Sequence, residues 1–311
     1  MKVMVTGACG FIGSHVVHKL LDRGDSVIAV DTCNWYAGIE RKHRAKESFN
    51  GLEVYPYDIR NPSAAALVDV SGVEAIVHLA ALPSVRQSIG KDKDYLSNNL
   101  DGTRNLMQAA IDSSANCKFI LASTSSVYGH SEAPFTEDMA CDRPLAPYPA
   151  SKRMAEMLGH SYHNLYGLSF TALRFFSVYG PNGRPDMMPY MTMENIAKQQ
   201  PITLFNGGEM WRDWTYVGDI VDGIISAVDA TLGYEIINLG RGQPVKMLDF
   251  VEAIEAEMGL WAQIETASAP LSEPERTQAD ISKARTLLGY EPSVSIADGV
   301  RQMCDWYKKC N

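Results

Sequence analysis

Residues 2–13 read KVMVTGACGFIG, an apolar run that breaks into glycines at three-residue intervals, Gly7, Gly10 and Gly13. Apolar residues at helical spacing follow in residues 16–21. The pattern predicts a strand, a tight turn and a helix. Gly7 and Gly10 would let the backbone approach a pyrophosphate at the helix N-terminus, and Gly13 would let the helix pack closely on the strand.

The next predicted strand, residues 26–30, ends at Asp31. An acid at this place in a dinucleotide-binding unit is expected to bind both hydroxyls of an adenosine ribose. The same acid repels a 2′-phosphate, and no arginine follows it at once. The sequence therefore favours NAD over NADP as the cofactor.

Apolar strands alternate with helical patterns through the first half of the chain. We expect strands at 52–57, 75–79 and 118–122, and helices at 64–70, 95–113 and 148–166. This alternation predicts an α/β fold with a Rossmann-type doubly wound parallel sheet, whose active groups gather at the carboxyl ends of the strands. From about residue 175 the pattern is irregular, up to a tail helix near 296–307. We expect an NAD-binding domain at 1–174, joined by about 212–238, and a smaller mixed α/β substrate lobe at 175–211 and 239–311.

Tyr148 and Lys152 stand four residues apart in one predicted helix. At this spacing they share a helix face, so the ammonium can approach the phenol and favour its phenolate, a usable general base near neutral pH. A bare pair of this kind is usually an ordinary surface tyrosine and lysine. The preceding glycine loop and strand pattern are what make this pair a candidate for redox chemistry.

Composition narrows the class of protein. The net charge of −9 over 311 residues argues against binding to nucleic acid or to an anionic membrane surface. The six cysteines form no C-x-x-C pair and no Cys/His metal spacing, so we expect reduced thiols and no metal site. No apolar stretch approaches a membrane span, and a first strand at residue 2 leaves no room for a signal peptide, so we expect a cytoplasmic protein.

Seven motifs occur in order along nearly the whole chain. They are TGACGFIG at 6–13, HLAA at 78–81, STSSVYG at 123–129, Tyr148-x-x-x-Lys152, RFFSVYGP at 174–181, WRDWTYV at 211–217 and DISKA at 280–284. Together they resemble an extended short-chain dehydrogenase/reductase that acts on nucleotide sugars. The resemblance makes the second lobe a nucleotide-sugar-binding lobe and NAD the cofactor.

The resemblance also implies which residues contact NAD. The expected contacts are Gly7, Gly10, Phe11, Ile12, Gly13, Asp31, Asp58, Ile59, Leu79, Ala80, Ala81, Asn98, Ser123, Tyr148, Lys152 and Phe176, with Asn34 as a weaker ribose candidate.

In the family that the chain resembles, the tyrosine at Tyr148 takes the proton of a sugar hydroxyl, usually at C4, while the C4 hydride passes to NAD. Thr124 would hydrogen-bond the same oxygen, with Lys152 completing the catalytic set. Related dehydratases and decarboxylases carry acids where this chain has Ser125 and Ser126. No carboxylate is then available to remove the C5 proton, so dehydration is disfavoured. Return of the hydride to the opposite face of the 4-keto sugar remains, which is C4 epimerisation.

Residues 81–88 and 178–187 are most similar to UDP-glucuronate 4-epimerases. A C6 carboxylate needs hydroxyl donors and a cation, for which the candidates are Thr124, Ser125, Ser126, Ser177 and Arg184. The resemblance places further residues around the UDP-sugar: Pro83, Arg86, Thr203, Phe205, Arg212 and Arg276. Arg86 and Arg276 are as readily ordinary surface arginines.

Other functions stay open. They are a UDP-glucose/UDP-galactose or N-acetyl 4-epimerase, a UDP-glucuronate decarboxylase, an NADPH-dependent reductase and a non-catalytic NAD-binding protein. Asp31 argues against the reductase, and the intact set of Thr124, Tyr148 and Lys152 argues against the non-catalytic protein. The helices expected at 95–113 and 148–166 carry more apolar residues than one core face needs, and related proteins pair these helices, so a homodimer is expected.

Overall fold

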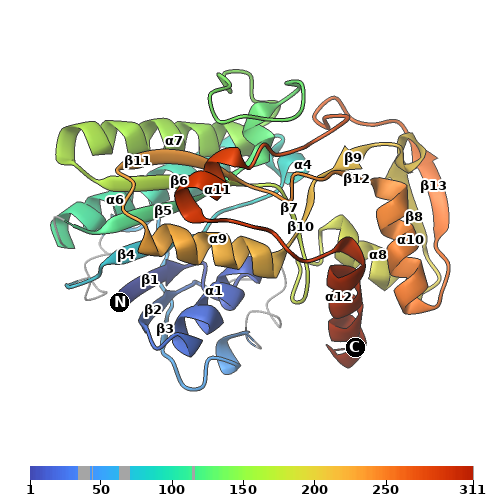
Figure 1. Cartoon of the computed structure of the whole chain (residues 1–311), viewed down its shortest axis with the longest axis horizontal. Coiled ribbons are helices and arrows are strands. Elements are labelled where there is room, and N and C mark those ends of the chain that lie inside the picture. Colours follow the sequence, from blue (N-terminus) through green and yellow to red (C-terminus); the bar gives the residue numbers. More distant parts are fainter. Residues whose placement is uncertain (34–42, 44, 63–70, 114–115, 311) are drawn as a thin grey trace.

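In the part of the chain that the computed structural model describes, residues 1–33, 43, 45–62, 71–113 and 116–310, seven parallel strands form the central sheet (Figure 1). Their order is β11-β6-β5-β4-β1-β2-β3. The strands are β1 (Lys2–Thr6), β2 (Ser26–Val30), β3 (Val54–Tyr55), β4 (Ala75–His78), β5 (Lys118–Thr124), β6 (Ser169–Phe175) and β11 (Tyr234–Leu239). The strand order reverses between β1 and β4, which is where a doubly wound sheet opens a ligand crevice.

Helices cover both faces of this sheet, so the predicted doubly wound fold is confirmed. α1 (Phe11–Asp22), α9 (Val217–Asp229) and α11 (Ser282–Leu288) lie on one face, and α6 (Gly102–Ser113) and α7 (Pro147–Tyr166) on the other. Val5 of β1 packs in the same core cluster as Leu20 of α1, whereas Met4 packs with Leu106 of α6. Because successive strand side chains point to opposite faces, a continuous apolar strand supplies both layers.

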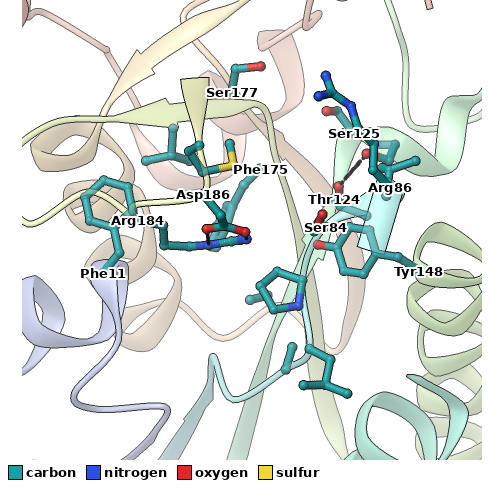
Figure 2. A pocket seen from close by; sticks show the side chains of 18 of the residues that line it. Phe11, Ser84, Arg86, Thr124, Ser125, Tyr148, Phe175, Ser177, Arg184 and Asp186 are labelled. Carbon is teal, nitrogen blue, oxygen red and sulfur yellow. Dashed lines mark hydrogen bonds and ion pairs between the residues drawn. The ribbon is translucent and has the colours of Figure 1, made fainter. Parts of the chain in front are cut away.

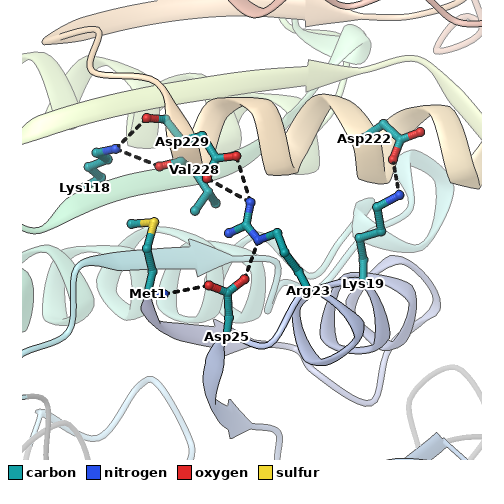
Figure 3. A network of polar contacts seen from close by, with 8 residues as sticks. All are labelled: Met1, Lys19, Arg23, Asp25, Lys118, Asp222, Val228 and Asp229. Carbon is teal, nitrogen blue, oxygen red and sulfur yellow. Dashed lines mark hydrogen bonds and ion pairs between the residues drawn. The ribbon is translucent and has the colours of Figure 1, made fainter.

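Ion pairs join the N-terminal region to α9, which comes from the second half of the chain (Figure 3). Arg23 binds Asp25 at 2.5 Å and Asp229 at 2.8 Å, and Lys19 binds Asp222 at 2.9 Å. Lys19, Asp222 and Asp229 are more than half exposed, so the two pairs that reach α9 contribute little to stability. The buried apolar face of α9 is what holds the helix against the sheet.

A second group of elements lies beyond the carboxyl ends of the central strands. It contains α8 (Met188–Ala197), α10 (Met247–Met258) and α12 (Ile296–Cys310), with the paired strands β7 (Ser177–Tyr179) and β10 (Trp214–Tyr216), β8 (Pro201–Phe205) and β13 (Gln263–Ala267), and β9 (Trp211–Arg212) and β12 (Val245–Lys246). Tyr179, Phe250 and Met303 belong to its own core cluster. Among the described residues, no helix is long and apolar enough to cross a membrane.

The structure differs from the predicted elements mainly at their ends. β3 keeps only the centre of the strand expected at 52–57, and β4 ends one residue before 79. β5 runs two residues past 122, which places Ser123 and Thr124 within the strand. The helix expected at 95–113 is α5 (Asp92–Leu96), a π-helical turn (Ser97–Asp101) and α6. The tail helix extends past 307 to Cys310, and the helix expected at 64–70 lies outside the described residues.

The predicted domain division stays a prediction. α9 and most of β11 come from the 212–238 segment that the sequence assigns to the first domain, and both belong to the layers of the central sheet.

Candidate active site

A cleft of about 580 Å³ lies between the carboxyl ends of the central strands and the second group of elements. Most of the predicted site residues line it: Gly7, Gly10, Phe11, Ile12, Gly13, Asp31, Asp58, Ile59, Leu79, Ala80, Ala81, Pro83, Arg86, Asn98, Ser123, Thr124, Ser125, Ser126, Tyr148, Lys152, Phe176, Ser177, Arg184, Thr203, Phe205 and Arg212. Asn34 lies outside the described residues. Arg276 is not part of the lining, because its guanidinium covers the ring of Trp211 at 5.4 Å.

The glycine loop forms one end of the cleft. Gly7 has a φ of +70°, and a Cβ there would lie 2.7 Å from the backbone nitrogen of Ala80. A Cβ on Gly13 would lie 2.0 Å from the carbonyl oxygen of Gly7. Neither position can therefore take a side chain without moving the backbone. The loop leads into α1 through Gly10, so the helix N-terminus faces the cleft without a side-chain cap, as a phosphate site requires.

Asp31 follows β2 beside this loop and is almost fully buried. Its Oδ1 accepts a hydrogen bond from the backbone N–H of Cys33 at 2.7 Å, and its Oδ2 accepts one from the backbone N–H of Cys9 at 3.1 Å. Two backbone N–H groups thus hold the carboxylate at the edge of the cleft.

Thr124 and Tyr148 lie on the same wall of the cleft, at the end of β5 and the start of α7 (Figure 2). Pro147 begins α7, where its missing N–H and fixed φ suit the first turn, and this sets Tyr148 at the cleft. Burial raises the pKa of Tyr148, while a hydrogen bond with Thr124 and the charge of Arg184 lower it.

Lys152 lies one turn further along α7 and lines the same cleft. It is only 2% exposed, and burial lowers its pKa from 10.5 to about 8, opposed by the charge of Glu156. A lysine with this pKa is still mostly protonated at pH 7, so α7 presents both a phenol and a cation to the cleft.

Glu156 continues this face of α7 and was not predicted as part of the site. Its Oε1 accepts from Ser123 Oγ at 2.5 Å and from Arg174 Nε at 2.9 Å. Its Oε2 accepts from Arg174 Nη2 at 2.8 Å and from Arg153 Nη1 at 3.0 Å. Glu156 and Arg174 are both fully buried. The spacing of four from Lys152 was the signal for Glu156, while its partner Arg174 on β6 could be identified only from the fold.

Hydroxyl groups and one arginine surround the part of the cleft next to Tyr148. Ser125 and Ser126 begin a 3₁₀ turn after β5, and Thr124 Oγ1 accepts from the backbone N–H of Ser126 at 3.1 Å. Ser177 and the Arg184 guanidinium lie across the cleft in Figure 2.

The guanidinium of Arg184 already has an acidic partner. It donates to Asp186 through Nε at 3.0 Å and Nη2 at 2.6 Å, and Gln87 donates to the same carboxylate at 3.2 Å. Asp186 was not among the residues predicted for the site. An acid two residues after an arginine gives no sign of whether the two side chains pair or separate.

Another acid that was not predicted, Glu273, joins two arginines at the opposite end of the cleft. Its Oε1 accepts from Arg86 Nε at 3.0 Å, and its Oε2 accepts from Arg212 Nη2 at 2.9 Å. Arg86 also covers the ring of Phe205, at 4.7 Å from the ring centroid. Burial lowers the pKa of Arg212, and the charge of Glu273 opposes that shift. This end of the cleft combines cations with an aromatic surface, which suits a nucleoside diphosphate.

Comparison with known proteins agrees with this geometry. Residues 3–240 match the family described as NAD dependent epimerase/dehydratase. The UDP-glucuronate 4-epimerase of Thermodesulfobacterium geofontis is 39% identical over 312 residues, which cover 98% of this chain and 96% of that protein. The crystal structure of UDP-glucuronic acid 4-epimerase from Bacillus cereus, in complex with UDP-glucuronic acid and NAD, has a TM-score of 0.93 at 35% identity and covers 100% of both chains.

A solved structure of an enzyme with a different reaction is also similar to this chain. The dTDP-glucose 4,6-dehydratase from Streptomyces venezuelae, solved with NAD, has a TM-score of 0.91 at 30% identity, over 99% of this chain and 97% of that chain. With a family match over residues 3–240 and relatives similar over nearly their full length, the chain belongs to the NAD dependent epimerase/dehydratase family.

Proposed function

We propose that the protein is an NAD-dependent UDP-glucuronate 4-epimerase, which interconverts UDP-glucuronate and UDP-galacturonate through a 4-keto sugar. The observation that carries the proposal is the wall formed by Thr124, Tyr148, Ser125 and Ser126, which joins a base to hydroxyl donors without an acid at the two serine positions. The similar proteins from Thermodesulfobacterium geofontis and Bacillus cereus are described as enzymes of this activity.

The residues at the sheet end of the cleft fit NAD. The glycine loop leads into the N-terminus of α1, which has no side-chain cap and would face a diphosphate, and Asp31 is anchored where a ribose would lie. Asp58 is paired with Arg60, which lowers the pKa of Asp58 and keeps it ionised as a hydrogen-bond acceptor. When bound, NAD supplies the redox chemistry at C4.

We assign the proton transfer to Tyr148. Its pKa is raised by burial in the cleft without ligands, so a neighbouring cation is needed before the phenolate can form near pH 7. We assign that role to Lys152, with Glu156 beneath it favouring the charged form. Thr124 hydrogen-bonds Tyr148 and would hold the sugar hydroxyl in line with the phenolate oxygen.

We assign the sugar carboxylate to the hydroxyls of Thr124, Ser125, Ser126 and Ser177, with Arg184 as the cation. A β-keto acid loses CO₂ when the breaking bond aligns with the ketone π system, so fixing the carboxylate protects the intermediate. A substrate carboxylate that binds Arg184 would share or replace the pairing with Asp186.

We assign the UDP moiety to the opposite end of the cleft. The diphosphate would lie at Arg212 and Arg86, and the uracil along Thr203 and Phe205 of β8. Arg276 stays outside this assignment because its side chain stacks on Trp211.

A homodimer is part of the proposal. Met154, Met157, Leu165 and Tyr166 of α7 are 43%, 58%, 68% and 58% exposed. Large apolar side chains on one helix favour pairing with the same helix of a second copy, which a C2 axis would allow. Size-exclusion chromatography with light scattering should give twice the mass of the 311-residue chain. A cytoplasmic location stays a prediction.

The function is tested by incubating the protein with UDP-glucuronate and following the sugar anomeric signals by proton NMR. We expect UDP-galacturonate without a UDP-pentose. UDP-xylose or its 4-keto form would refute protection of the carboxylate. Turnover of UDP-glucose with none of UDP-glucuronate would favour the alternative, a UDP-glucose/UDP-galactose 4-epimerase.

A further inference from the structure

Two cysteines meet at the glycine loop. Cys9 lies in that loop, Cys33 follows β2, and the Cys33 thiol donates to Cys9 Sγ at an Sγ–Sγ distance of 3.6 Å. Cys9 is 2% exposed, whereas Cys33 is partly exposed. All six cysteines of the chain are thiols in the structure. A disulfide bond is about 2.05 Å long, so these two sulfur atoms would have to approach by roughly 1.5 Å to form one.

The same two residues hold Asp31. The backbone N–H of Cys9 binds one carboxylate oxygen, and the backbone N–H of Cys33 binds the other. Cys33 has a φ of +47°, a left-handed conformation that non-glycine residues seldom adopt. The two thiols therefore belong to the same two residues whose backbone N–H groups hold the carboxylate expected at the NAD ribose.

We propose that Cys9 and Cys33 form a thiol-oxidation site, which a hydroperoxide converts to a disulfide and which thereby weakens NAD binding at Asp31. The accessible Cys33 thiolate attacks the peroxide oxygen, forming a sulfenic acid and releasing water from hydrogen peroxide. The Cys9 sulfur then attacks the sulfenic sulfur and displaces a second water. Two thiols lose two electrons and two protons, and one peroxide becomes two waters.

The expected weakening follows from how little room the loop has. Drawing Cys9 toward Cys33 displaces the loop between Gly7 and Gly13, where the backbone already packs against Ala80 and against itself. The two N–H groups can then no longer hold Asp31 in place, and at least one hydrogen bond between Asp31 and ribose is lost. We expect the dissociation constant for NAD to rise at least about tenfold, which corresponds to about 1.4 kcal/mol.

The test uses the 311-residue protein cleared of NAD, divided into a reduced portion and a portion treated with hydrogen peroxide. Remaining thiols are alkylated and mapped by peptide mass spectrometry, and the affinity for NAD is measured by calorimetry before and after dithiothreitol. We expect a Cys9–Cys33 cross-link, weaker NAD binding and full recovery on reduction. Cys33→Ser and Cys9→Ala should each show the same NAD affinity with and without peroxide, and Cys310→Ser, which removes the other partly exposed cysteine, should respond as the wild type does.

Alkylation of both Cys9 and Cys33 after peroxide treatment would overturn the proposal, as would oxidation of Cys33 beyond the sulfenic acid without a cross-link. A complete cross-link with an unchanged NAD affinity would overturn the coupling to Asp31. The inference rests on the proposed NAD site only in this last step. If the reduced protein failed to bind NAD, the proposed function would be refuted, while the peptide map would still decide whether the thiol site exists.

Discussion

Glu156→Gln should destabilise the fold strongly, because it leaves a buried cation without its counter-charge. Glu156 and Arg174 are both 0% exposed and share two hydrogen bonds, at 2.8 and 2.9 Å. Glutamine keeps the shape but replaces one acceptor with a donor that faces the Arg174 guanidinium. Breaking a buried ion pair from one side costs about 3–5 kcal/mol, so we expect a loss of that size in the free energy of unfolding.

The assay is urea unfolding followed by circular dichroism, on wild type, Glu156→Gln and the matched control Arg153→Gln. Arg153 binds the same carboxylate at 3.0 Å, but its side chain is 24% exposed, so its removal should cost no more than about 1 kcal/mol. A loss below about 1 kcal/mol in Glu156→Gln, or equal losses in both variants, would show that burial does not set the strength of this pair. The slope with urea concentration should stay unchanged, which keeps the comparison between the same two states.

Other substitutions test the parts of the site separately. Tyr148→Phe should abolish turnover yet retain NAD binding, measured by calorimetry; unchanged turnover would reject its role as the base. Lys152→Met should lose activity but stabilise the NAD-free fold by up to about 3 kcal/mol at pH 7, since it removes a lysine whose pKa is lowered to about 8. Between about pH 8 and 10.5 the unfolded chain holds a proton at Lys152 that the folded chain has lost. The free energy of unfolding of the wild type should therefore rise with pH relative to that of Lys152→Met. Parallel profiles of unfolding free energy against pH would contradict the lowered pKa. Gly13→Ala should lower the melting temperature and weaken NAD binding at least about tenfold, because its Cβ would lie 2.0 Å from the carbonyl oxygen of Gly7. Arg184→Leu should lower kcat/KM for UDP-glucuronate about 10- to 100-fold, and an equal loss with UDP-glucose would argue against its contact with the carboxylate.

The central sheet could be predicted because its signals are local. The glycine spacing at residues 7–13, and the alternation of apolar strands with helical patterns, are typical of a parallel sheet with helices on both faces. Strand ends depend instead on which neighbouring strand supplies a hydrogen-bond partner. The sequence does not show these partners, so the predicted β3 was too long and the predicted β5 too short. The π-helical turn at Ser97–Asp101 has no sequence signal that we can identify.

The site residues that belong to sequence motifs could be predicted. Thr124, Tyr148 and Lys152 meet in one cleft because β5 and α7 are adjacent in the fold. The charge partners Glu156, Asp186 and Glu273 were missed, because an ion pair depends on where two side chains come together in space. The same reason applies to Arg276, which forms an isolated bridge with Trp211 of β9 and places its guanidinium over the Trp211 ring.

The proposed chemistry is tested most directly with UDP-glucuronate that carries deuterium at C4, incubated with the protein in ordinary water. If the hydrogen at C4 passes to bound NAD and returns from it while Tyr148 exchanges only the hydroxyl proton, UDP-galacturonate should form with its deuterium retained at C4. Loss of the deuterium to water during epimerisation, or formation of a UDP-pentose in place of the epimer, would contradict the account.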